Sequence, residues 1–259
     1  MTQPLIYGPT LQASGAFDGG KITEQKPIGF PGEGSVIKRV GPLFYWAWAQ
    51  SKEEGYLPLH PHQAFEIMTY VVQGKAQHGD TLGTKSTIGA GGAQVMQTGS
   101  GVSHEERFIG PDMEGFQIWF EPSMKEALKR QPTYSQFEHE QFPSEQGDGY
   151  VSKTVLGAGS PVELVAEAQM WDVIIEPGKA FRRSIAEGNT LTALAIRGSG
   201  TIGYASGDRA AARFNHKDFI VQQADAELEV ILTAGGEETL RIILIEVPSS
   251  VSYPLLRKR

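Results

Sequence analysis

Short strand-like segments run along the whole chain and limit what it can fold into. Each is rich in Val, Ile, Thr and aromatic residues, and turns that contain glycine separate them. The 259 residues include 31 glycines and 15 prolines, well above the roughly 12% of average usage, which favours frequent turns over long helices. We predict strands at 35–40, 43–49, 65–72, 93–97 and 115–120, and again at 151–156, 169–175, 190–196, 200–205, 218–222, 228–232 and 240–247. This spacing is typical of all-β sandwiches or barrels.

One short helix is expected between the two groups of strands, at residues 123–130, which lie between two prolines. Ser123 and Glu126 have the spacing of a capping box, in which the serine side chain accepts a hydrogen bond from the glutamate amide and the carboxylate reaches back.

A polar stretch at 132–149 follows the helix and leads into the second group of strands. The two halves also look distantly alike, because 69–74 and 193–198 both read as a strand that ends in a glycine turn. We therefore predict two barrels, an N-terminal one at 1–138 that carries the functional site and a C-terminal one at 139–259.

Composition and charge exclude several classes of function. The chain has no cysteine, which rules out disulfides, cysteine-ligated zinc, iron–sulfur clusters and thiol catalysis. The net charge of −7 is spread over both halves without a basic stripe, so we expect no direct binding of nucleic acid. Neither a secretory segment nor a membrane-spanning apolar run is apparent, and we expect a soluble, cytoplasmic protein without membrane contact.

Three of the six histidines fall in two tight clusters. His60 and His62 are two residues apart, so in an extended segment their side chains lie on the same face. Glu66 has the same parity and would face the same way. About 40 residues later, His104 and Glu106 form a second pair with this spacing. Three imidazoles and one carboxylate from neighbouring strands would suit Fe, Ni, Co, Mn or Cu.

The other three histidines are predicted to lie outside the site. His78 stands beside a glycine and an aspartate and reads as a turn residue, while His139 and His216 lie in polar surroundings and are expected to face solvent.

Three motifs, in this order and spacing, resemble the pirin branch of the cupin superfamily. They are His60-Pro61-His62-x-x-Phe65-Glu66, Met96-x-Thr98-Gly99-Ser100-Gly101-x-x-His104-x-Glu106 and Phe116-Gln117-Ile118-Trp119. The resemblance is strongest from about residue 57 to 122. It implies a bicupin, two antiparallel jelly-roll-type β-barrels of which only the N-terminal one binds metal, with His60, His62, His104 and Glu106 as the ligands.

Glu66 is the position where cupins differ. In many other cupins the carboxylate ligand belongs to the His-x-His motif, and here it would be Glu66. In pirins it lies two residues after the third histidine, and His104-x-Glu106 is intact. We therefore expect Glu106 to be the ligand and Glu66 to orient an imidazole, a role that metal sites commonly require.

The chain also departs from the pirin pattern. Gln63-Ala64 stands where Arg-Gly is usual, and Val95 stands where a tryptophan is usual. These changes are expected to alter the shape and polarity of the pocket and therefore the substrate. The second half has Phe181-Arg182-Arg183-Ser184 near the position of the missing His-x-His, so we predict no metal there.

The resemblance implies an oxidoreductase with quercetin 2,3-dioxygenase-like activity on a flavonol-type substrate and O₂. The cofactor would be one divalent transition metal, iron first, with Ni, Cu, Mn, Co or Zn as alternatives. Glu106 would be the catalytic residue, because a metal-bound phenol is more acidic and a nearby carboxylate can accept its proton.

Two other interpretations stay open. The protein could be a non-catalytic, redox-responsive metal binder that regulates a protein partner, as the resemblance also implies. Another cupin chemistry, such as sugar-phosphate isomerisation, is less favoured because no basic cluster for a phosphate lies near the motifs.

Overall fold

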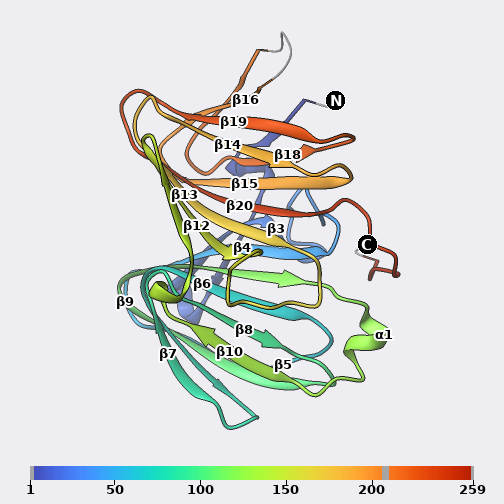
Figure 1. Cartoon of the computed structure of the whole chain (residues 1–259). Helices are drawn as coiled ribbons and strands as arrows, with labels where there is room; N and C mark the ends of the chain where they lie inside the picture. Colours follow the sequence, from blue (N-terminus) through green and yellow to red (C-terminus); the bar gives the residue numbers. More distant parts are fainter. Residues whose placement is uncertain (1–2, 206–209, 258–259) are drawn as a thin grey trace. The chain divides into compact units, whose positions relative to one another are not determined.

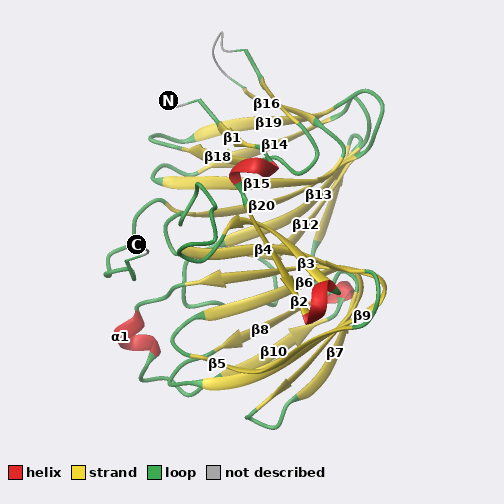
Figure 2. Ribbon diagram, turned by 180° about the vertical axis from the view of Figure 1, so that it is seen from behind, coloured by secondary structure: helices red, strands yellow, loops and turns green. Residues whose placement is uncertain are grey.

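The computed structural model describes residues 3–205 and 210–257, and nearly all of their regular structure is β-strand (Figures 1 and 2). Within these ranges the one α-helix is α1 (Met124–Ala127), and single 3₁₀ turns lie at Pro9–Leu11, Asp18–Gly20 and His139–Gln141. The all-β prediction is confirmed. Across the same ranges, no helix has the length and apolar character that crossing a membrane requires.

The chain forms two compact units. The N-terminal unit holds Gln12–Gln141, Leu164–Ala166 and the described tail from Ser252 onward. The C-terminal unit holds Phe142–Glu163 and the described part of Glu167–Val251, together with the first described residues up to Leu11.

A single antiparallel network of nine strands builds the N-terminal unit (Figure 1). Its path runs β10-β8-β6-β9-β4-β3-β2, with β5 paired to β9 and β7 paired to β6. The strands are β2 (Ala13–Phe17), β3 (Ile22–Ile28), β4 (Leu43–Ser51), β5 (Gly55–His62), β6 (Glu66–Asp80), β7 (Lys85–Gly89), β8 (Ala93–Gln97), β9 (Val102–Phe120) and β10 (Thr133–Phe137).

Two long strands, β6 and β9, organise this unit. They pair from Glu66 opposite Phe120 to Asp80 opposite His104, with two register shifts on the way. The first half of β9 therefore lies between β5 and β6, and its second half lies between β4 and β6. Side chains that are far apart along β9 can thus face the same interior.

Strand β4 supplies much of the aromatic core of the N-terminal unit. Trp46 and Trp48 are buried, and so are the residues between and before them. A strand buried on both faces reads as a continuous apolar run, which is what 43–49 shows.

The C-terminal unit contains two antiparallel sheets. One has the order β1-β18-β15-β20-β13-β12-β11 and the other β14-β19-β16-β17. The strands are β1 (Leu5–Tyr7), β11 (Ser144–Gly147), β12 (Tyr150–Leu156), β13 (Gln169–Ile175), β14 (Ala180–Ile185), β15 (Asn189–Arg197), β16 (Gly200–Tyr204), β17 (Ala212–Phe214), β18 (Phe219–Gln223), β19 (Leu228–Ala234) and β20 (Leu240–Pro248). An aliphatic core that includes Val173, Val230 and Leu244 packs within this unit.

The predicted capping box is wrong. Helix α1 spans four residues, and the Ser123 side chain makes no cap hydrogen bond. The Ser123 carbonyl accepts the Glu126 N–H instead, at 3.0 Å. The Glu126 carboxylate accepts from Lys129 at 2.9 Å, so it is not available to the start of the helix.

The predicted strand at 35–40 is a loop with isolated bridges at Ile37 and Val40. At the start of this loop, the Ser35 hydroxyl accepts the N–H groups of Gly29 at 2.9 Å and Ala13 at 3.3 Å, and donates to the Lys26 carbonyl at 3.0 Å. A side chain thus satisfies backbone groups that a ladder would otherwise pair. Conversely, the stretch at 132–149 contains β10 and β11.

Candidate metal centre

Alternate residues of the first half of β9 face the interior of the N-terminal unit. Val102, His104, Glu106 and Phe108 are buried, whereas the residues between them are partly exposed. This alternation is the period of a strand with one face in a core. Both polar residues of the second sequence cluster therefore lie inside.

The neighbouring strands bring further polar residues to the same face. His60 of β5 is the cross-strand partner of His104, and Asp80 of β6 is its partner on the other side. His78 of β6 lies opposite Glu106. Because directly opposed residues in a sheet share a face, β5, β9 and β6 together line one polar wall.

Three imidazoles converge at this wall. The ring centroids of His60, His62 and His104 are 4.5 to 4.7 Å apart, and one nitrogen from each lies within 4.8 Å of the others. Nε2 of His60 faces Nε2 of His104 at 3.0 Å. The three residues could hold a metal ion.

The protonation state of these rings suits a metal. The Pro58 carbonyl lies 2.8 Å from Nδ1 of His60, so the neutral ring donates there and keeps its lone pair on Nε2. Burial, followed by the neighbouring imidazoles, lowers the pKa of both His62 and His104 to about 3. At neutral pH these rings are uncharged and can act as ligands.

Buried nitrogens without a hydrogen-bond partner test whether these residues fit a metal ion. Nε2 of His62 and Nδ1 of His104 are buried without a hydrogen-bond partner within the described part of the chain. Buried polar atoms in proteins are nearly always paired. Nε2 of His104 already faces Nε2 of His60. An ion among the three rings would therefore give the buried Nε2 of His62 a partner, so the residues present fit the metal that the sequence predicts.

Glu106 lies beside the imidazole cluster with its own partners. Its Oε2 accepts from Nε2 of Gln117 at 2.6 Å, and its Oε1 accepts from the Thr69 hydroxyl at 3.4 Å. The group that could hold a metal comprises the three histidines without it. Its negative charge still reaches the cluster, where it acts to raise the pKa of His62 against the stronger effect of burial. A role as fourth ligand stays a prediction.

Glu66 does not orient an imidazole, so that expectation is wrong. Its carboxylate accepts from Gln97 at 2.6 Å and from the N–H groups of Val165 and Ala166 at 2.7 and 2.8 Å. It therefore fastens the segment Leu164–Ala166 to β6. Parity correctly places Glu66 inside, but the segment it binds is a hundred residues away along the chain.

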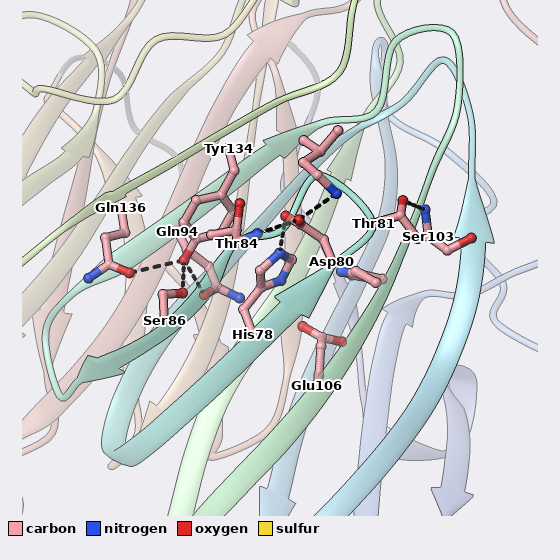
Figure 3. Close-up of polar contacts among 12 residues, drawn as sticks. His78, Asp80, Thr81, Thr84, Ser86, Gln94, Ser103, Glu106, Tyr134 and Gln136 are labelled. Carbon is pink, nitrogen blue, oxygen red and sulfur yellow. Dashed lines mark hydrogen bonds and ion pairs between the residues drawn. The ribbon is translucent and has the colours of Figure 1, made fainter.

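His78 is the interior residue that the sequence analysis missed. It lies in β6, is buried, and its Nε2 is 2.8 Å from Oδ2 of Asp80 (Figure 3). Its ring stacks on Tyr134 at 4.5 Å and meets the His104 ring edge-on at 5.4 Å. His78 and Asp80 have the same two-residue spacing as His60 and His62, which is the signal that could have found them.

A hollow of about 590 Å³ opens at the cluster through His62. Its volume falls in the range of small-molecule sites. Its lining comes from the end of β5 and the start of β9 with the loops beside them, namely Pro61, His62, Gln63, Thr81, Gly101, Val102 and Ser103.

Sequence comparison identifies relatives of the chain. The pirin family profile matches residues 45–120. A "Pirin-like protein" of Caulobacter vibrioides is 30% identical over 195 residues, which cover 70% of this chain and 69% of the relative. The chain belongs to the pirin family.

Solved structures of related proteins share the fold. The crystal structure of the bacterial pirin YhhW from Escherichia coli, in complex with nickel(II), has a TM-score of 0.77 at 18% identity and covers 95% of this chain and 99% of that one. A quercetin 2,3-dioxygenase from Acinetobacter baumannii has a TM-score of 0.75 at 20% identity, with 94% and 86% covered. This pirin thus has the predicted bicupin fold.

Proposed function

We propose that this pirin is a metal-dependent dioxygenase of the quercetin 2,3-dioxygenase type that acts on a flavonol-like substrate. The observation that carries the proposal is the convergence of three imidazoles next to a buried carboxylate. The name of the A. baumannii neighbour supports the reaction type, and the hollow at His62 has room for a small aromatic substrate.

The ligands in this proposal are His60, His62, His104 and Glu106. Nitrogen and oxygen donors of this kind suit Fe, and also Ni, which the E. coli pirin holds. A transition metal bound there would supply the Lewis acidity that makes a substrate hydroxyl more acidic and the redox chemistry that O₂ requires.

The chain's own residues orient the substrate and take its proton. Glu106 is the catalytic base: Oε2 is engaged by Gln117, while Oε1 has only a long contact with Thr69. Oε1 is therefore the atom that accepts the proton of the flavonol hydroxyl.

Flavonol absorbance under air tests the proposal. Protein loaded with Fe(II) or Ni(II) is expected to bleach a flavonol, and His62→Ala and Glu106→Gln are each expected to reduce the rate at least about 100-fold. His139→Ala is the matched control, because His139 is exposed and lies away from the cluster. Full metal occupancy without turnover of any flavonol would contradict the enzyme and favour the metal-binding regulator.

A further inference from the structure

We propose that Gln117, held by Trp119, is a positioning residue that sets the orientation of the Glu106 carboxylate. The inference rests on the proposed function, because it takes Glu106 as part of the metal centre. Gln117 and Trp119 both lie on the second half of β9. Neither is among the predicted metal ligands.

The hydrogen bonds form a chain with one direction. Nε1 of Trp119 lies 3.0 Å from Oε1 of Gln117, and Nε2 of Gln117 lies 2.6 Å from Oε2 of Glu106. An indole nitrogen can only donate. Trp119 therefore binds the amide oxygen of Gln117, which leaves the NH₂ group as the part that faces Glu106.

The fold explains how residues eleven positions apart meet. Gln117 lies opposite Thr69 of β6, and both side chains contact Glu106, which is on the first half of β9. The register shifts between β6 and β9 carry the two halves of the strand pair to different parts of the same interior.

The two oxygens of Glu106 become unequal as a result. Oε2 receives the 2.6 Å bond from Gln117, whereas Oε1 receives only the 3.4 Å contact from Thr69. A carboxylate held in this way presents one oxygen to a metal or to a substrate proton. Trp119 also meets the His62 ring edge-on at 4.8 Å, so the same residue touches one imidazole and directs the carboxylate.

The chain offers a matched control in the pair Gln97 and Glu66. Nε2 of Gln97 is also 2.6 Å from its carboxylate, and the Thr133 hydroxyl fixes the amide by donating to Oε1 at 3.0 Å. The chemistry is the same, but this carboxylate binds the backbone of Leu164–Ala166 and no histidine.

Cu(II) bound to the purified protein gives a readout besides activity. Chelator competition measures its affinity, and electron paramagnetic resonance reports the ligand set. Gln117→Leu is expected to change the spectrum and weaken Cu(II) binding about 10-fold, as loss of a residue that orients a ligand commonly does. Trp119→Phe keeps a ring against His62 but loses the N–H, and should act in the same direction with a smaller effect.

The double variant separates a relay from two independent contacts. If Trp119 acts through Gln117, the Trp119→Phe change should add nothing in the Gln117→Leu background. Gln97→Leu should leave both affinity and spectrum as in the wild type. Thermal unfolding checks that each variant is folded, and Trp119→Phe, which preserves most of the buried volume, carries the test if Gln117→Leu does not fold.

Three outcomes would overturn the inference. Unchanged Cu(II) affinity and spectrum in both single variants would remove the positioning role of Gln117. Additive effects in the double variant would remove the part in which Trp119 acts through Gln117. Either result leaves the proposed function intact. Wild-type protein that takes up no metal would overturn the proposed function as well.

Discussion

Individual histidines decide what the N-terminal unit can bind. A buried imidazole that stays uncharged cannot form an ion pair with a carboxylate. Its unprotonated nitrogen therefore needs a hydrogen-bond donor or a metal ion as partner. His62 and His104 are in this position, because burial lowers the pKa of each to about 3. A bound ion would offset the cost of burying the unpartnered Nε2 of His62.

The same pKa values predict how the metal-free protein responds to acid. In the unfolded chain the two histidines titrate near 6.5, whereas folded they titrate near 3. Between these values the unfolded state binds more protons, so the free energy of unfolding falls as pH falls from about 6.5 toward 3. Urea unfolding of chelator-treated protein at pH 7 and pH 5 measures this loss.

His62→Ala removes one of the two groups and should therefore make that loss smaller, while His139→Ala should leave it as in the wild type. An equal loss in His62→Ala and wild type would show that burial of His62 does not oppose its protonation.

For single residues, the sequence predicted on which face of a strand a side chain lies better than it predicted which group that side chain binds. The two-residue spacing correctly places each pair on one face: His104 and Glu106 are buried, and His60 and His62 are partly buried and meet His104. It says nothing about which groups bind each other. Glu66 therefore has the expected face but an unexpected role, because its partners come from Leu164–Ala166.

Strands β6 and β9, which pair with two register shifts, carry most of the polar residues around the imidazole cluster. Gly74 lies where β6 shifts register against β9, and it has a left-handed φ of 77°. A Cβ there would approach the Met113 Cα to 2.9 Å and the Ile109 carbonyl to 3.0 Å. Glycine is required both for the backbone conformation and for the close approach of the two strands.

Gly74→Ala is therefore expected to destabilise the protein more than Gly83→Ala. Gly83 also has a left-handed φ, 92°, but an added Cβ would meet nothing within 4 Å. Both variants carry the conformational cost of about 1–2 kcal/mol, and the crowding at Gly74 adds about 1–3 kcal/mol. Chemical denaturation measures the free energy of unfolding of each variant. An equal loss in the two variants would show that the close approach of β6 and β9 at Gly74 does not contribute to stability.

Strand boundaries were harder to predict than the fold class. A strand was predicted at 115–120 and an extended segment around His104 and Glu106, and β9 joins the two in one strand, Val102–Phe120. Residues 35–40 have a strand-like composition but form a loop, in which the Ser35 side chain bonds to the backbone of Gly29 and Lys26. In both places, hydrogen bonds to distant segments override the local pattern.

Over the whole molecule, the two units differ in what their interiors contain. The described interior of the N-terminal unit holds a wall of imidazoles and carboxylates. In the C-terminal unit, the stretch near the missing His-x-His lies on β14, where Arg183 packs over the Trp171 ring at 3.7 Å. We therefore predict one metal ion per chain, held by the N-terminal unit.

The metal content of the purified protein tests this assignment most directly. After loading with excess Fe(II) or Ni(II) and removal of free metal, wild-type protein and Glu66→Gln are predicted to hold one ion per chain by elemental analysis, and His104→Ala is predicted to hold none. Wild-type protein without bound metal, or His104→Ala that retains a full equivalent, would contradict the account.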